Sequence, residues 1–160
     1  MNKRNLDILK RCEVFLGLTD GELGKISDLP SCTVRTYKAG TTIFREGEEA
    51  STLHVLDEGR VMLTMRLSAG RGSREEVVDV VTKGGILSWS VLVAPYILTR
   101  SAKCIVPCKM LSIDGKEFRF FLDKEPYTGY EIMKGVVRVI ASRLRDTQWL
   151  LAFGKRRVTL

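Results

Sequence analysis

Between Cys32 and Ile113 the chain repeats a pattern that few folds accommodate, namely short alternating apolar and polar stretches that end at glycine turns. Apolar residues at every second position place one face of a strand in a core, and glycine supplies the positive φ that tight turns require. Gly40, Gly47 and Gly59 fall at three such turns. Turn signals roughly every 8–12 residues indicate a compact antiparallel barrel or roll. The sequence therefore predicts a mainly β fold with flanking α, an antiparallel β-roll of the jelly-roll, cupin-like kind over about residues 32–113.

Helical patterns flank the strand region on both sides. Residues 1–30 are typical of short helices, with Thr19 as an N-cap before the acidic Glu22. After the roll the apolar period changes to that of a helix, first over a short segment and then over a long stretch at about 126–153. No linker-like run interrupts the chain, so we expect one domain over residues 1–160.

The long helix carries an apolar seam. Its members, spaced four, three, four and seven apart, are Met133, Val137, Ile140, Leu144 and Leu151. Ile132, Val136 and Val139 widen it. Soluble monomers rarely leave a large apolar surface bare. The seam therefore predicts either pairing with a second copy of the helix in a homodimer, or folding back on the chain's own roll.

Composition excludes several classes of protein. No apolar run approaches the roughly 18 residues of a membrane span, and no apolar segment of a secretory signal follows the basic N-terminus. The four cysteines contain no C-x-x-C pair, which favours buried or half-buried thiols in a reducing compartment. We expect a cytoplasmic protein without membrane association.

The single histidine, His54, excludes the two- and three-histidine metal clusters, and no Ser-His or Cys-His pairing is evident. His54 lies in an apolar run and is interpreted as a strand residue. We therefore expect no enzyme, no metal and no resident cofactor, and an enzyme on a cupin-like roll is disfavoured.

Positive charge gathers at the C-terminal end. The formal net charge is +7, and the segment from Pro126 onward holds seven basic residues against two acidic ones. The basic residues are Lys134, Arg138, Arg143, Arg145, Lys155, Arg156 and Arg157. Two interpretations stay open: contact with nucleic acid or an acidic partner, and a solvated helix face with a frayed end.

Two segments carry a family resemblance. Residues 38–47 (KAGTTIFREG) and 53–61 (LHVLDEGRV) resemble the signature of cyclic-nucleotide-binding domains. These domains are the sensory rolls of the catabolite activator protein family and of the cyclic-AMP-dependent kinase regulatory subunit. The resemblance covers roughly residues 10–150 and implies that the long helix forms a dimer interface.

The resemblance also implies a phosphate-binding cassette over residues 83–102, in which a short helix and an arginine hold a cyclic phosphate. Free N–H groups at a helix start attract anions, and a guanidinium adds charge-assisted hydrogen bonds. Arg100-Ser101-Ala102 matches the Arg-Ser-Ala that closes such cassettes. The ligand-binding residues that this implies are Gly84, Gly85, Leu87, Ser88, Trp89, Ser90, Arg100 and Ser101.

The cassette departs from the family at one pair. Ser88 and Trp89 stand where nucleotide-binding members have Gly-Glu, whose carboxylate accepts from the ribose 2′-hydroxyl. An indole N–H only donates. Losing a charged acceptor costs about 1.5–3 kcal/mol, roughly ten- to a hundredfold in affinity. We therefore expect cyclic nucleotide such as cAMP or cGMP to bind weakly, or a different small anionic ligand to bind.

The leading hypothesis is a regulatory ligand-sensing domain, homodimeric through its long helix. The alternative is a ligand-independent interaction or scaffold protein. A transcription factor of this family needs about 60–80 further residues for a winged helix-turn-helix. The chain ends seven residues beyond Phe153, so we expect no helix-turn-helix domain and no sequence-specific DNA binding.

Overall fold

A computed structural model describes residues 2–70 and 72–154. Two short helices come first, α1 (Lys3–Lys10) and α2 (Asp20–Ser27). The strands follow as β1 (Thr33–Tyr37), β2 (Thr42–Phe44), β3 (Thr52–Glu58), β4 (Val61–Ala69), β5 (Gly72–Val81), β6 (Ile86–Leu87), β7 (Ser101–Cys104) and β8 (Cys108–Asp114). The helices η1 (Trp89–Leu92, a 3-10 helix), α3 (Gly115–Lys124) and α4 (Pro126–Phe153) complete the fold. The basic run Lys155-Arg156-Arg157 lies outside the described residues.

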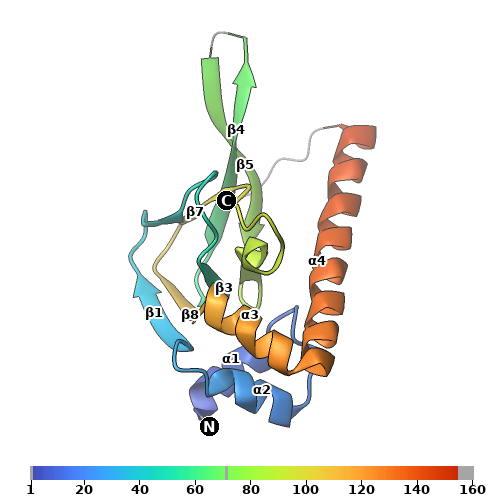
Figure 1. The fold of residues 1–160 in the computed structure, drawn as a ribbon. Coiled ribbons are helices and arrows are strands. Elements are labelled where there is room, and N and C mark those ends of the chain that lie inside the picture. Colours follow the sequence, from blue (N-terminus) through green and yellow to red (C-terminus); the bar gives the residue numbers. More distant parts are fainter. Residues whose placement is uncertain (1, 71, 155–160) are drawn as a thin grey trace.

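The strands form two antiparallel sheets packed as a roll. One sheet has the strand order β1-β8-β3-β6 and the other β2-β7-β4-β5. β4 and β5 continue as a hairpin that projects from the roll, and α4 stands beside the roll (Figure 1). The predicted fold class, a mainly β roll with short N-terminal helices and a long C-terminal helix, is confirmed.

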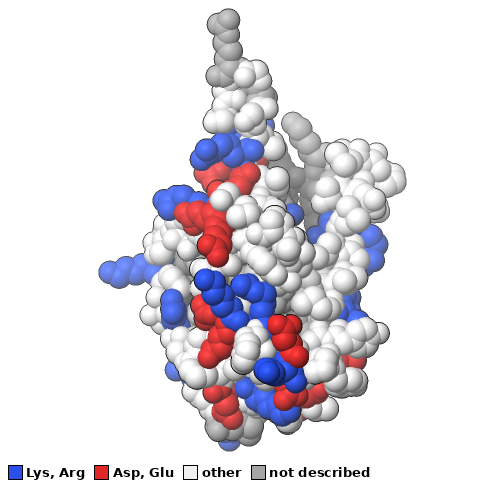
Figure 2. Space-filling view, in the orientation of Figure 1, with Lys and Arg blue, Asp and Glu red and all other residues white. Residues whose placement is uncertain are grey.

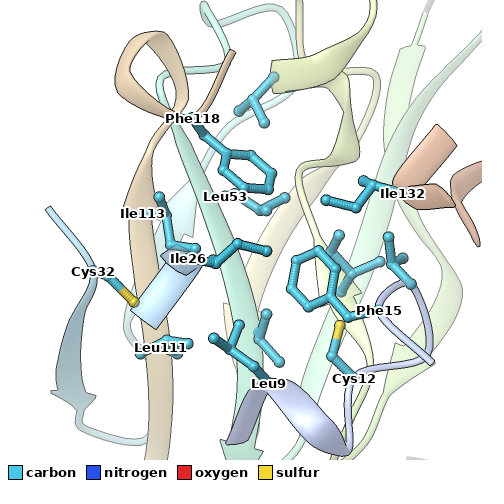
Figure 3. Packing of buried hydrophobic residues seen from close by; sticks show 14 of the residues in the cluster. Leu9, Cys12, Phe15, Ile26, Cys32, Leu53, Leu111, Ile113, Phe118 and Ile132 are labelled. Atoms are coloured by element: carbon cyan, nitrogen blue, oxygen red, sulfur yellow. The ribbon is translucent and has the colours of Figure 1, made fainter. Parts of the chain in front are cut away.

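Strand β3 explains why strict alternation is incomplete. Five consecutive residues of β3 are buried. Leu53 and Val55 belong to a cluster with Phe15 and Phe118, whereas Leu56 belongs to a second cluster between the sheets. Figure 3 shows Leu53 of β3, Phe15 of the α1–α2 connection and Phe118 of α3 pointing into one cluster. Because β3 is covered on both faces, its buried residues are consecutive and do not alternate with exposed ones.

The turn glycines behave as the sequence indicates. Gly40, Gly47 and Gly59 have φ of 81°, 86° and 104°. At Gly59 a Cβ would also lie 2.6 Å from the Cys108 Sγ and 2.7 Å from the Pro107 carbonyl oxygen, so only glycine fits. All four cysteines are free and buried, as predicted.

Helix α4 has two apolar faces with different surroundings. Ile132, Val136 and Val139 are buried against the molecule's own core. Gly135 brings the helix so close to the α1–α2 connection that a Cβ there would lie 2.1 Å from the Val14 carbonyl oxygen. The second face is exposed to solvent, since the side chains of Val137, Leu144 and Leu151 are 63%, 56% and 83% exposed. Figure 2 shows the free end of α4 without charged side chains on the visible face.

Candidate functional site

The cassette segment lies between β6 and β7 and begins at Ser88. Ser88 has φ 58° and ψ 40°, the left-handed conformation that glycine adopts most easily. Its hydroxyl donates to the carbonyl oxygens of Leu87, at 2.6 Å, and of Thr52. The backbone at Ser88 therefore adopts a conformation that favours glycine, and local hydrogen bonds from the serine hydroxyl help to hold it.

Helix η1 is a single 3-10 turn of four residues without a side-chain cap. A helix this short has little macrodipole, because only a few peptide units align. An anion near η1 would therefore depend mainly on side-chain charge.

The cavity at the cassette is small, with a volume of about 30 Å³. It brings together five predicted site residues, which are Leu87, Ser88, Trp89, Ser90 and Arg100. Since one water needs about 10–15 Å³ of such space, this cavity holds at most a few waters and no nucleotide. The half-buried Trp89 packs against the main core cluster and forms part of the cavity wall.

Three predicted site residues lie elsewhere. Gly84 and Gly85 line a groove of about 380 Å³ between the roll and α4. Ser101 lines a different hollow, on the outer face of the second sheet, and its hydroxyl accepts the Glu46 N–H at 2.9 Å. In this conformation Arg100 and Ser101 therefore face different hollows.

A second arginine reaches the cassette cavity from helix α4. Arg143 lines the cavity together with Arg100, and its guanidinium lies 3.5 Å from the Asp79 carboxylate and 4.0 Å from that of Glu13. Burial, and then the neighbouring Arg143, lower the pKa of Arg100, whereas Asp79 raises it. An arginine stays charged throughout, so two guanidiniums face one cavity, and that of Arg143 is paired with the Asp79 carboxylate.

Sequence reasoning missed both Asp79 and Arg143 as site residues. Asp79 had a usable signal, because it is an acid inside the apolar strand run Val77-Val78-Asp79-Val80-Val81. Arg143 appeared only as one basic residue of the C-terminal segment. Its position one turn after the buried Val139 places it on the roll-facing side of the helix.

Helix α3 also holds the cassette. The Arg119 guanidinium donates to the Val91 carbonyl oxygen at 2.6 Å, and it lies 4.3 Å from the centre of the Tyr96 ring. One side chain thus clamps the end of η1 and the loop that follows it. Arg119 therefore links this loop to α3, which leads directly into α4.

Within residues 2–70 and 72–154 no three His, Cys, Asp or Glu side chains gather in a manner suited to a metal ion. No helix in that part of the chain is long and apolar enough to cross a membrane.

Comparisons with known proteins agree with the fold described above. A family model for the cyclic nucleotide-binding domain matches residues 34–125. A solved structure from Geobacter metallireducens GS-15, assigned to the cyclic nucleotide-binding proteins, is 27% identical, with a TM-score of 0.70, over 85% of this chain and 95% of that one. The catabolite activator protein of Thermus thermophilus shares the fold at 20% identity, with a TM-score of 0.69, over 88% of this chain and 62% of that one.

One curated relative is much longer than the chain. Glutaminase 1 of Bradyrhizobium diazoefficiens is 28% identical over 130 residues, which are 80% of this chain and 19% of that protein. The chain thus spans about a fifth of the length of this relative.

Proposed function

Because the chain belongs to the cyclic nucleotide-binding domain family, we propose that it is a regulatory ligand-sensing module whose cassette takes a small anionic ligand. The observation that carries the proposal is the pair Arg100 and Arg143, which face one cavity from the roll and from α4. Like charges at close range raise each other's energy, and an anion between them relieves the repulsion.

We assign the module no catalytic step, and we place it in the cytoplasm because its free thiols suit a reducing compartment.

The ion pair between Arg143 and Asp79 supplies a mechanism. An anionic ligand at Arg100 competes with the Asp79 carboxylate for the Arg143 guanidinium. Since the cavity is about 30 Å³, a ligand larger than a few waters enters only when α4 or Trp89 moves aside. Ligand binding is therefore coupled to the position of α4, and the ligand selects the state in which the cavity is open.

Trp89 determines which anion fits. It contributes no acceptor for a ribose hydroxyl and occupies volume where the resemblance places a carboxylate. We expect Trp89→Glu to raise the affinity for cyclic AMP by about tenfold or more, because one charged acceptor is worth about 1.5–3 kcal/mol. Isothermal titration calorimetry of wild type and variant measures this directly.

The proposal itself is tested by titrating cyclic AMP, cyclic GMP and cyclic di-GMP into the wild type and into Arg100→Ala. We expect saturable heat with at least one ligand, and a loss of about ten- to a hundredfold in Arg100→Ala. Arg74→Ala is the matched control, since Arg74 is an exposed arginine on the β4–β5 hairpin. Absence of heat and of any shift in melting temperature with all three would refute sensing of these ligands.

The same result would favour the alternative, a ligand-independent interaction protein. The small size of the cassette cavity supports that alternative, since Trp89 and its neighbours leave about 30 Å³.

Homodimerisation through α4 is part of the proposal. Val137, Leu144 and Leu151 recur every seven residues on the bare face of the helix, a spacing typical of a coiled-coil seam. We expect Leu144→Asp to shift sedimentation toward the monomer, and Arg145→Glu, one position further on and off the seam, to leave it unchanged. A monomeric wild type would contradict this part of the proposal.

A further inference from the structure

The roll contains a second cavity, of about 170 Å³, which is more than five times the volume of the cassette cavity. Phe44, Ser88 and Leu98 line both cavities and so stand between them. The other residues that line the second cavity come from β1, β2, β3 and the connection from β2 to β3, and the lining includes neither the residues of η1 nor Arg100 and Arg143. The two cavities therefore differ in the charged and aromatic groups that they present.

His54 supplies an open hydrogen-bonding atom to this cavity. Its side chain lines the cavity although the residue is only 5% exposed, and Nδ1 lies 2.9 Å from the Ser112 Oγ. Among the described residues Nε2 has no hydrogen-bond partner, yet every fully buried side-chain nitrogen or oxygen described does have one. Nε2 must therefore reach accessible space, and the cavity provides it. Burial, and then Arg35, lower the pKa of His54 to about 4, so the ring is neutral at pH 7.

Aromatic rings form the walls beside His54. The ring centres of Tyr37 and Phe44 each lie 6.4 Å from that of the imidazole, Tyr37 edge-on and Phe44 nearly parallel. A cavity of about 150 Å³ is large enough to hold a benzene ring, so the volume of about 170 Å³ here leaves room for one ring of that size. It therefore suits one planar ring with a small substituent, held by ring contacts of the kind that stabilise aromatic pairs.

The charges at the cavity select against anions. Two exposed acids, Glu48 and Glu49, line it with one exposed arginine, Arg35. The Glu48 carboxylate accepts the Arg45 N–H at 3.0 Å, while in the described part of the chain the Glu49 carboxylate has no hydrogen bond or ion pair. N–H donors on a ligand would find a free carboxylate here, and a carboxylate ligand would be repelled.

We propose that this cavity is a second binding site, for a neutral or cationic single-ring nitrogen heterocycle that carries an exocyclic amino group. Such a ring packs against Tyr37 and Phe44, bonds to His54 Nε2, and points its N–H groups toward Glu49. A heterocycle with both a lone pair and N–H groups matches either tautomer of His54. The site does not depend on the function proposed for the cassette.

The probe is 2-aminopyrimidine, followed by NMR, because His54 is the only histidine of the chain and gives one set of imidazole signals. We expect a saturable shift of these signals and nuclear Overhauser contacts from the probe to the rings of Tyr37 and Phe44. His54→Phe should weaken binding by about tenfold. The contacts in the wild type decide the question even if that variant does not fold.

Charge selectivity is tested with benzoate and with Glu49→Gln. We expect benzoate to bind at least tenfold more weakly than 2-aminopyrimidine, and Glu49→Gln to weaken the latter about two- to fivefold, as for an exposed charge. Glu76→Gln on the β4–β5 hairpin is the matched control and should change nothing. The proposal is overturned by the absence of a saturable shift, by equal binding of benzoate, or by probe contacts to Trp89 in place of Tyr37 and Phe44.

Discussion

Replacing Gly135 by alanine tests how α4 is held against the N-terminal segment. A Cβ at this position would lie 2.1 Å from the carbonyl oxygen of Val14, 2.9 Å from its carbonyl carbon and 3.0 Å from its Cα. Ordinary contact begins at 3.4 Å, so helix and loop must separate by more than 1 Å. Both partners are backbone atoms, and no side-chain rotation relieves the overlap.

The magnitude follows from two opposing effects. Alanine favours the helix over glycine by about 1 kcal/mol. Overpacking costs typically about 1–3 kcal/mol, and contact with rigid backbone belongs at the upper end of that range. Moving α4 also loosens the packing of Ile132 and Val136, which are 0% and 2% exposed. We therefore expect Gly135→Ala to lower the free energy of unfolding by about 2 kcal/mol, or roughly 4–8 °C in Tm for a chain of this size.

Urea denaturation followed by far-ultraviolet circular dichroism measures the change. Gly129→Ala is the control within the same helix, because its Cβ would meet the Leu122 carbonyl oxygen at 3.3 Å and the Leu122 Cβ at 3.5 Å. We expect that variant to match the wild type or exceed it slightly. A Gly135→Ala protein as stable as Gly129→Ala would show that α4 does not lie against the Val14 backbone.

Three further outcomes are expected. The pKa of His54 is about 4 in the folded protein and about 6.5 in the unfolded chain, so the unfolded chain binds more protons between these values. The free energy of unfolding should therefore fall by up to roughly 1.4 kcal/mol per pH unit as the pH drops from about 6.5 to 4. Above pH 6.5 His54 should make no pH-dependent contribution, and an imidazole that titrates near 6.5 by NMR would contradict this expectation. Arg119→Lys should lower the free energy of unfolding by about 1–2 kcal/mol and speed amide hydrogen exchange over residues 91–98, because it weakens the hydrogen bond to the Val91 carbonyl and the contact with Tyr96. Unchanged exchange rates would contradict the conclusion that Arg119 holds this loop. Gly59→Ala should lower the free energy of unfolding, measured by thermal denaturation, by at least about 2 kcal/mol, because φ is 104° and the new Cβ would overlap the Cys108 Sγ. A free energy of unfolding equal to that of the wild type would contradict this expectation.

Sequence patterns predicted the roll well because its edges and turns follow local rules. The capping box at Thr19 and Glu22 is present at the start of α2, and α4 runs from Pro126 to Phe153, which are the bounds expected. These features depend on neighbours within a few residues. Where both sides of a strand are covered, as in β3, alternation disappears, and the apolar run alone marks the strand.

The candidate site was less accessible to sequence reasoning, because its groups come from distant segments. The pairing of Arg143 with Asp79 joins a helix to a strand more than sixty positions earlier in the chain. Likewise, no local pattern shows that Arg100 and Ser101 face different hollows, since this depends on how β7 enters its sheet. The left-handed φ of 58° at Ser88 is likewise a finding of the structure, although the resemblance places a glycine at that position.

Trp89 provides the most direct test of ligand sensing at the cassette. The chain has two tryptophans, so Trp149→Phe, at an exposed position on α4, leaves Trp89 as the only one. Its fluorescence is followed while cyclic AMP, cyclic GMP or inorganic phosphate is added, with and without Arg100→Ala. We expect a saturable change with at least one of these anions that is lost in the Arg100→Ala background. No change with any of them, or an equal change without Arg100, would contradict a ligand site at the cassette.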